Sequence, residues 1–322
     1  MDRISLFPGR HKIIREDTGE EYYIIIEEAD GPLVLGTPYN RDSVLRNETA
    51  LALGLDLASN PTPNDAFMAL AVRTAVNTSP PTIPLPPDLD PILNNNSWSM
   101  IANISENWIA ADNMNTWDIA SHIGWHIGDA KSLTIGGVNH ELRIIGFNHD
   151  GLAGGGYAGI TLELIPCWGA TAAARIGMEA TSTNANGWHG SRMRMETLPN
   201  YRNQLPADLQ AVMKMVLKPT SIGSQSSTIN IVQDNIFLLS EVEVMGHHNQ
   251  SAAGEGRRYL FYTTYSIAAA AIKQQPAGTV ATWWLRSPSA VNNLSFIAVG
   301  LNGVSGWEAS TQASAVSFGI CI

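Results

Sequence analysis

The sequence predicts an α+β protein, and three observations support that prediction. Asp, Glu, Lys and Arg make up only 15% of the 322 residues, against about 25% in average globular proteins. Uncharged polar residues and 28 glycines fill the difference, which favours a loop-rich chain over one built from long charged helices. Strand patterns and helix patterns follow one another in mixed order, as in α+β folds. The length allows more than one domain and a substantial core.

The first 78 residues predict a small module. "HKIIREDTGEEYYIIIEE", residues 11–28, contains two β-rich runs separated by the turn Asp17-Thr18-Gly19, which indicates a hairpin. Two short helices are expected in "NRDSVLRNETALALGL" and "PTPNDAFMALAVRTAV", and Asn64 is a suitable N-cap for the second. A module of this size buries little surface, so we expect it to dock on a partner or on copies of itself.

Residues 79–96, "SPPTIPLPPDLDPILNNN", contain six prolines. Proline excludes a regular helix and favours polyproline II, a semi-rigid spacer of about 3.1 Å per residue. We place the domain boundary here.

Residues 97–322 predict a larger mixed domain. Ser97 is a suitable cap for a helix whose apolar face carries Ile101, Ile104 and Trp108. Three strands are expected in "WHIGDAKSLTIGG", "HELRIIGFNHD" and "YAGITLELIPCW". The strongest helix pattern is "LPADLQAVMKMVLK", in which Pro206 and Asp208 suit the first turn. Its apolar stripe consists of Leu205, Leu209, Val212, Met213 and Val216.

The segment "DNIFLLSEVEVMG" is predicted to be a strand, buried at first and then alternating, with Val242 and Val244 on one side. The rest of the chain is expected to consist of loops and short strands.

Charge and cysteine content exclude several functional classes. The formal net charge is -10, which argues against nucleic-acid binding, because that requires clustered Lys and Arg. Cys167 and Cys321 show no Cys-x-x-Cys spacing and are expected to be small buried hydrophobes. The N-terminus lacks the apolar core of a signal peptide, and no run of about 18 apolar residues predicts membrane insertion. We expect the chain to be synthesised as a soluble protein in the cytoplasm.

Polar motifs were weighed as catalytic or metal sites. His122 and His126 are spaced for one metal on a helix, but the motif lacks a catalytic glutamate and Gly124 weakens the helix, so structural histidines are favoured. "FNHDG" lacks the oxygen spacing of a calcium loop, and a turn is favoured. A further polar segment is interpreted as a surface loop or subunit contact; it contains His247, His248, Glu255, Arg257 and Arg258.

A glycosidase needs two carboxylates about 5–9.5 Å apart. The sequence does not pair its candidates, which are Asp112, Asp118, Asp129, Glu163 and Glu196. It also contains no Gly-x-Ser-x-Gly elbow, P-loop or dinucleotide fingerprint. We therefore expect no enzyme activity, no cofactor and no metal.

Seven blocks occur in an order that resembles a family: "NSWSMIANIS", "WHIGDAKSLTIGG", "IIGFNHD", "GWHGSRMRMETLPN", "LPADLQAVMK", "FLLSEVEVMG" and "WWLRSPS...FGICI". They resemble a domain of Firmicutes prophage and gut-phage tail proteins. That domain is similar to the C-type-lectin-like fold of the variable receptor-binding proteins of diversity-generating retroelements. The segment "GTPYNRDSVLRNETALALGLD" resembles the N-terminal part of tail-fibre proteins. The resemblance implies a virion-attachment module at 1–78, a linker at 79–96 and a C-type-lectin-like receptor-binding domain at 97–322.

The resemblance also implies a rigid scaffold beneath a variable surface, since a binding loop needs fixed support. The scaffold residues would be Trp283, Trp284, Leu285, Arg286, Pro288 and Phe296. Arg286 is expected to reach buried carbonyls or a carboxylate, and Phe296, Val299, Gly303 and 319–322 are expected to form the strand core. The receptor-binding positions would be Ala290, Val291, Asn293, Leu294, Ala298, Gly300, Leu301, Val304, Gly306, Trp307, Glu308, Thr311, Gln312 and Ser314. Trp307 is the strongest single contact candidate, because aromatic side chains anchor interfaces.

We therefore expect a phage tail-fibre or tail-tip adhesin, located in the virion, that binds a bacterial surface glycan or protein. Residues 1–78 would contact other tail proteins, and a homotrimer would suit a fibre axis. Two alternatives stay open: a structural baseplate or decoration protein, and a tail-associated glycosidase.

Overall fold

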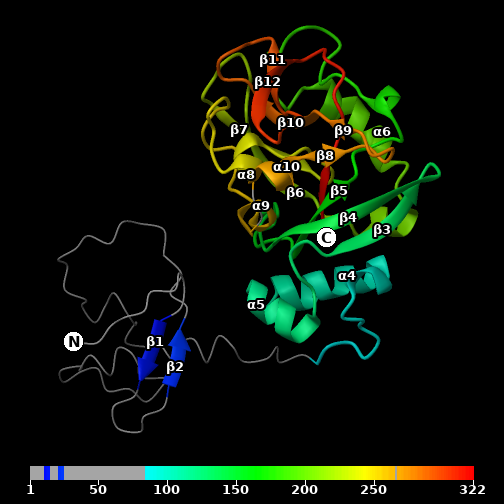
Figure 1. The fold of residues 1–322 in the computed structure, drawn as a ribbon, viewed down its shortest axis with the longest axis vertical. Coiled ribbons are helices and arrows are strands. Elements are labelled where there is room, and N and C mark those ends of the chain that lie inside the picture. Colours follow the sequence, from blue (N-terminus) through cyan, green and yellow to red (C-terminus); the bar gives the residue numbers. More distant parts are fainter. Residues whose placement is uncertain (1–10, 15–20, 25–83, 265–266) are drawn as a thin grey trace, which may run out of the picture. The chain divides into compact units, whose positions relative to one another are not determined.

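The computed structural model describes residues 11–14, 21–24, 84–264 and 267–322. The chain divides into two compact units, Met1–Thr78 and Ser79–Ile322. In the first unit, β1 (His11–Ile14) and β2 (Glu21–Ile24) form an antiparallel pair, which confirms the two predicted strands (Figure 1). The helices expected within 40–55 and 61–76 lie outside the described residues.

The second unit is a mixed α/β structure with several small antiparallel sheets and few helices (Figure 1). Its largest sheet has the strand order β13-β5-β4-β3. The strands are β3 (Ala130–Ile135), β4 (Val138–Phe147), β5 (Ile160–Ile165) and β13 (Gly319–Cys321). The three strands expected between residues 125 and 168 are thus confirmed. The last strand of the chain pairs with β5, so the C-terminal "FGICI" lies in the core.

Residues at the end of the proline-rich segment pack on the second unit. Leu93 is buried in the η1 turn (Leu93–Asn95), and Leu89 packs against the core. The backbone carbonyl of Asn94 accepts from Lys131 Nζ at 3.0 Å, and Asn94 Oδ1 accepts from Ser132 N at 2.8 Å. Trp125 Nε1 donates to Asp90 O at 3.3 Å. Leu85 packs against the core as well, so the predicted spacer from Leu85 onward is attached to the folded body rather than extended away from it.

Short helices lie beside the large sheet (Figure 1). The predicted helix after Ser97 is confirmed as α4 (Trp98–Ile104), because Ser97 Oγ accepts from Met100 N and Trp98, Ile101 and Ile104 are buried. It continues as the wider π-helical turn η2 (Ser105–Ala110). The chain then forms α5 (Thr116–Asp118) and η3 (Ile119–Ile123), which ends at Gly124 with φ 89°. No helix in the described part of the chain is long and apolar enough to cross a membrane.

Smaller elements connect the sheets. The turns η4 (Ala172–Ala174) and η5 (Met193–Thr197) precede α6 (Leu198–Arg202). The pairs β6 (Val216–Ser221) with β7 (Ile229–Asp234), and β8 (Lys273–Gln274) with β9 (Val280–Ala281), are two-stranded and antiparallel. The short helices α9 (Leu260–Thr264) and α10 (Ile267–Ala271) lie between them in the chain.

Two predictions of secondary structure were wrong. The helix expected through "LPADLQAVMKMVLK" spans only α7 (Ala207–Val212). Met213 is extended and Val216 begins β6, because pairing with β7 requires an extended chain there. The second error is the strand expected through "DNIFLLSEVEVMG": Asp234 ends β7, Phe237 forms only an isolated bridge to Gly319, and the rest of the segment contains helix α8 (Glu241–Met245). Ser240 and Glu243 form a capping box, and Gly246 ends the helix with φ 78°.

A three-stranded sheet has the order β10-β11-β12, with β10 (Trp283–Pro288), β11 (Ser295–Val299) and β12 (Ser305–Ala309). All residues of β10 and β11 are buried, whereas β12 is mostly half-buried or exposed. In Figure 1 this sheet lies at one end of the second unit, and α4 and α5 lie at the other.

Candidate functional site

The candidate site is the outer part of the three-stranded sheet, and its foundation is β10. The six residues predicted to be scaffold are all buried: Trp283, Trp284, Leu285, Arg286, Pro288 and Phe296. Trp283 Nε1 donates to Ala271 O at 2.9 Å, and Trp284 Nε1 donates to Ile176 O at 2.7 Å. Each indole is therefore both packed and hydrogen-bonded, which holds the strand in one position.

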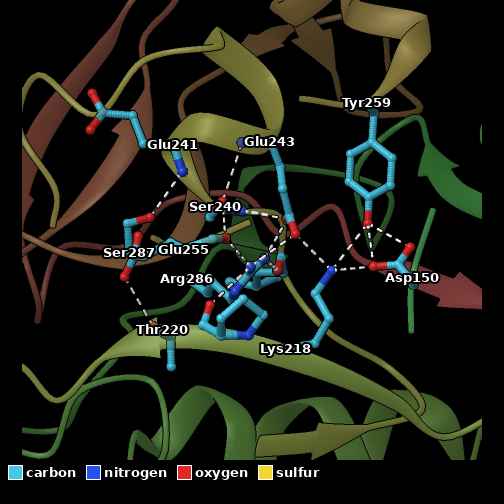
Figure 2. Close-up of polar contacts among 12 residues, drawn as sticks. Asp150, Lys218, Thr220, Ser240, Glu241, Glu243, Glu255, Tyr259, Arg286 and Ser287 are labelled. Atoms are coloured by element: carbon cyan, nitrogen blue, oxygen red, sulfur yellow. Dashed lines mark hydrogen bonds and ion pairs between the residues drawn. The ribbon is translucent and has the colours of Figure 1, made fainter. Parts of the chain in front are cut away.

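Arg286 connects β10 to the elements behind it, as expected. Its guanidinium donates to the carbonyl oxygens of Leu238 at 3.0 Å, Pro219 at 3.2 Å and Glu255 at 2.7 Å. It also forms a forked ion pair with Glu243 of α8, in which Nη2 lies 2.9 Å from Oε1 and Nη1 contacts Oε2 (Figure 2).

Neighbouring charges control the ionisation of this cluster. Burial alone would raise the pKa of Glu243, but Arg286 and Lys218 reverse that effect and lower it. Burial opposes the charge of Arg286 as well, yet Glu243 raises its pKa. Burial raises the pKa of Glu255, which Ser221 and Arg286 only partly offset. The prediction of a polar surface loop was wrong for Glu255, because its side chain is fully buried where it accepts from Thr220 and Ser221.

A second buried carboxylate anchors the outer strand. Glu241 Oε1 accepts from Ser305 Oγ at 2.9 Å, at the start of β12. Its Oε2 accepts from Gln250 N at 3.1 Å and from the backbone and hydroxyl of Ser251 at 2.9 and 2.7 Å. Ser287 Oγ of β10 accepts from Glu241 N at 2.9 Å. The first turn of α8 is therefore bonded to both outer strands of the sheet.

The structure exposes most of the predicted receptor-binding positions. Five large apolar side chains have high exposed fractions: Val291 59%, Leu294 46%, Leu301 59%, Val304 56% and Trp307 54%. Asn293, Thr311 and Gln312 are also exposed, and Ala290, Gly300, Gly306 and Glu308 are half-buried. These residues come from β12, from the loops at both ends of β11, and, for Thr311 and Gln312, from the turn after β12.

Two of the predicted receptor-binding residues, Ala298 and Ser314, are buried, so their prediction as contact residues was wrong. Ala298, with 1% exposed, lies in the central strand between Trp284 of β10 and Gly306 of β12. Ser314, with 3% exposed, pairs with Ile176 through two backbone hydrogen bonds. Neither side chain reaches the surface. Gly303, expected in the strand core, lies in the loop between β11 and β12 with φ 75°, a conformation that favours glycine.

Asn184, which the sequence did not single out, holds the loop between β10 and β11. Its buried amide donates to the carbonyl oxygens of Ser289, Asn292 and Ser295, at 3.3, 3.0 and 2.8 Å. Its backbone N donates to Asn293 O at 2.8 Å. The loop that carries Val291 and Leu294 is thus fixed by one side chain more than 100 positions earlier in the chain. A local sequence pattern cannot indicate so distant a contact.

The remaining motifs serve the fold. His122 Nδ1 contacts Asp118 O at 2.9 Å, and His126 is exposed, with its backbone N donating to Asp129. Asn148 has φ 47° and donates to Ile109 O and Met114 O, consistent with the predicted turn. Both cysteines are free and buried, as expected. Among the described residues, no three His, Cys, Asp or Glu side chains are arranged to hold a metal ion.

Two of the carboxylates considered for catalysis, Glu163 and Asp129, have different surroundings. Glu163 is fully buried, and its Oε2 lies 2.8 Å from Arg143 Nη2. Its carboxylate also accepts from the Tyr262 hydroxyl and contacts Lys273 Nζ. Asp129 lies elsewhere, in the lining of a hollow of about 250 Å³, and it is the only carboxylate among the residues that line that hollow. Neither place presents the two accessible carboxylates that glycoside hydrolysis needs.

Comparison with known proteins gives one match. Residues 172–318 are similar to a family described as a domain of unknown function, DUF6273. That segment includes α8, β10, β11 and β12, and ends just before β13. No curated protein and no solved structure matches the chain.

Proposed function

We propose that the protein is an adhesin of a phage tail, and that it binds a bacterial surface glycan or protein through β12 and the two loops flanking β11. The ordered sequence blocks support the tail-protein assignment and a C-type-lectin-like second unit. The proposed surface comprises Val291, Leu294, Leu301, Val304 and Trp307. Residues 1–78 would attach the protein to the virion, and the proposed assembly is a homotrimer.

One observation supports this function best: large apolar side chains are exposed on a support that is entirely buried. Every residue of β10 and β11 is buried, and β10 alone contributes two tryptophans and the Arg286 ion pair. Trp307, on the next strand, is 54% exposed directly opposite the buried Ile297. Exposed aromatic residues on a rigid frame suit binding, because little conformational entropy is lost when they bind.

The edge of β12 favours a second candidate, a structural baseplate or decoration protein. In the part of the chain that the structure describes, β12 pairs with no strand other than β11, so it is an edge strand. An edge strand beside apolar side chains also suits contact with another subunit. The two candidates differ in what the surface binds, a foreign cell or a copy of the same protein.

Binding to cells separates the two candidates. Full-length protein, fluorescently labelled, is incubated with cells of the bacterial species whose genome or phage carries the gene, in competition with intact phage. The adhesin predicts saturable binding that phage particles displace, and loss of binding in Leu301→Asp and Trp307→Asp. Ile231→Asp is the matched control, since Ile231 is 61% exposed on β7, outside the proposed surface.

The oligomeric state is measured for the same variants by light scattering. If Leu301→Asp and Trp307→Asp keep the wild-type oligomer and lose cell binding, the adhesin is supported. If the wild-type protein does not bind these cells, or if the two substitutions dissociate the oligomer and leave binding unchanged, the adhesin is refuted. The second result favours the structural protein.

A further inference from the structure

A buried lysine lies between two buried carboxylates, behind the proposed binding surface. Lys218 of β6 is 1% exposed, and its Nζ is 2.7 Å from Asp150 Oδ1 and 2.7 Å from Glu243 Oε1 (Figure 2). Nζ also lies 3.1 Å from the Tyr259 hydroxyl and 4.1 Å from the centre of the Phe237 ring. The proposed surface does not use this cluster.

The two carboxylates have different environments. Glu243 is already neutralised by its forked ion pair with Arg286. Asp150 is 4% exposed and has no arginine; apart from the amine, its partners are hydroxyl groups, the Cys321 thiol and the neighbouring His149. Lys218 and Asp150 thus form a buried pair of opposite charges, and charges are costly in a protein interior.

We propose that Lys218 Nζ and the side-chain carboxyl of Asp150 condense to an amide, an intramolecular isopeptide bond, with release of one water. This bond would join β6 to the segment that follows β4. It is a modification site, and it is independent of the receptor-binding proposal.

The reaction balances with groups that the chain supplies. The ammonium of Lys218 passes one proton to the carboxylate of Asp150, which leaves a neutral amine and a neutral carboxylic acid. The amine nitrogen attacks the carboxyl carbon, and its second proton moves to the Glu243 carboxylate 2.7 Å away. Glu243 then returns that proton to the departing hydroxyl, which leaves as water while the C–O bond breaks and the C–N amide remains.

Asp150 Oδ2 has the hydrogen-bond donors that such a reaction needs. Thr161 Oγ1 donates to it at 2.6 Å and Tyr259 Oη at 2.9 Å, while Lys218 contacts the other oxygen. Negative charge that develops on Oδ2 in the tetrahedral intermediate would be stabilised by these two hydroxyls. Burial, and the nearby charge of Asp150, raise the pKa of Tyr259 well above its usual range, so its hydroxyl keeps its proton.

Glu243 is the proton carrier rather than the electrophile. Nearby cations lower the pKa of both carboxylates against the effect of burial, that of Glu243 through Arg286 and Lys218 and that of Asp150 through Lys218 and His149. The roles are therefore assigned from contacts: Arg286 keeps Glu243 paired, whereas Asp150 can receive its proton from its ion-pair partner Lys218. Arg286 donates to both oxygens of Glu243, and this fixes the carboxylate so that Oε1 also accepts from Lys218 Nζ (Figure 2). Arg286 is thus a positioning residue for the same step.

Mass spectrometry of the full-length folded protein tests this proposal. The intact mass is expected to be about 18 Da, one water, below the mass of the sequence. Proteolysis should release a branched peptide that joins Lys218 to Asp150. Lys218→Arg, which keeps the charge, should have the full mass, and Lys273→Arg, which changes the other buried lysine, should keep the loss.

Cyclisation of Asp150 onto the backbone of Gly151 would also remove one water, and the branched peptide distinguishes the two products. A branched peptide at Lys218 and Asp150 supports the proposal. The full sequence mass in folded wild-type protein, or the loss of water without a branched peptide, overturns it. If Lys218→Arg fails to fold, the peptide map of the wild-type protein decides alone.

Discussion

Replacing Arg286 with methionine is expected to destabilise the second unit strongly. The change removes the hydrogen-bond donor to three backbone carbonyl oxygens, those of Pro219, Leu238 and Glu255, and the ion-pair partner of Glu243. Breaking a buried ion pair by removing one partner costs about 3–5 kcal/mol. The pair is fully buried, so we expect the free energy of unfolding to fall by that amount.

The assay is urea unfolding followed by tryptophan fluorescence. All nine tryptophans lie between residues 98 and 307, so the signal reports on the second unit alone. The double variant Arg286→Met with Glu243→Leu removes both charges and should be less destabilised than the sum of the two single variants, by at least about 1–2 kcal/mol. A loss below about 1 kcal/mol in Arg286→Met, or additive losses, would refute the role assigned to this pair.

Three further predictions concern packing and charge. Gly319→Ala should lower the free energy of unfolding by about 1–3 kcal/mol, because a Cβ there would lie 2.7 Å from the Phe237 ring. Gly306→Ala should leave it unchanged, because no atom lies within 4 Å of a Cβ at that position. Equal losses for the two variants in urea unfolding would contradict this prediction. Trp284→Ala should cost about 3–5 kcal/mol, and Trp307→Ala less than half of that, because Trp307 is 54% exposed; a larger loss for Trp307 would contradict its surface role. Burial lowers the pKa of Lys273 from 10.5 to about 8 despite the nearby Glu163, so between these values the unfolded chain holds a proton that the folded chain has lost. Stability should therefore rise with pH in that window, by up to about 1.4 kcal/mol per pH unit, relative to Lys273→Met; a constant difference between the two proteins would contradict it.

The sequence predicted the elements that local patterns determine. Ser97 caps α4 because its hydroxyl satisfies a free backbone N–H three residues later, and that signal is local. The strands between residues 130 and 165 combine β-branched residues with turns at glycine, as in the pair Gly136-Gly137. Helix α8 has an equally local signal in Ser240-x-x-Glu243, a capping-box pattern that the strand prediction from Val242 and Val244 did not consider.

Long-range contacts explain most of what the sequence did not predict. Helix α7 is short because β6 must begin soon after it, and β6 forms only by pairing with β7. The burial of Ala298 follows from its place in a central strand, which its own neighbours in the sequence do not indicate. The positions of Asn184 and Glu255 depend on partners 34 to 111 residues away. The exposure of Trp307 was expected from the family resemblance, and its neighbours alone would not have decided it, because Trp188 also stands among small and polar residues and is fully buried.

The central claim is that Trp307 contacts a bacterial receptor, and the affinity of matched tryptophan variants tests it most directly. Trp117 is 64% exposed on α5, at the far end of the unit from Trp307 (Figure 1). Dissociation constants for cells are measured with full-length wild-type protein, Trp307→Asp and Trp117→Asp. Removal of a hot-spot side chain costs at least about 2 kcal/mol, or roughly 30-fold in affinity. We predict that loss for Trp307→Asp and wild-type affinity for Trp117→Asp; equal affinities for all three proteins would contradict the account.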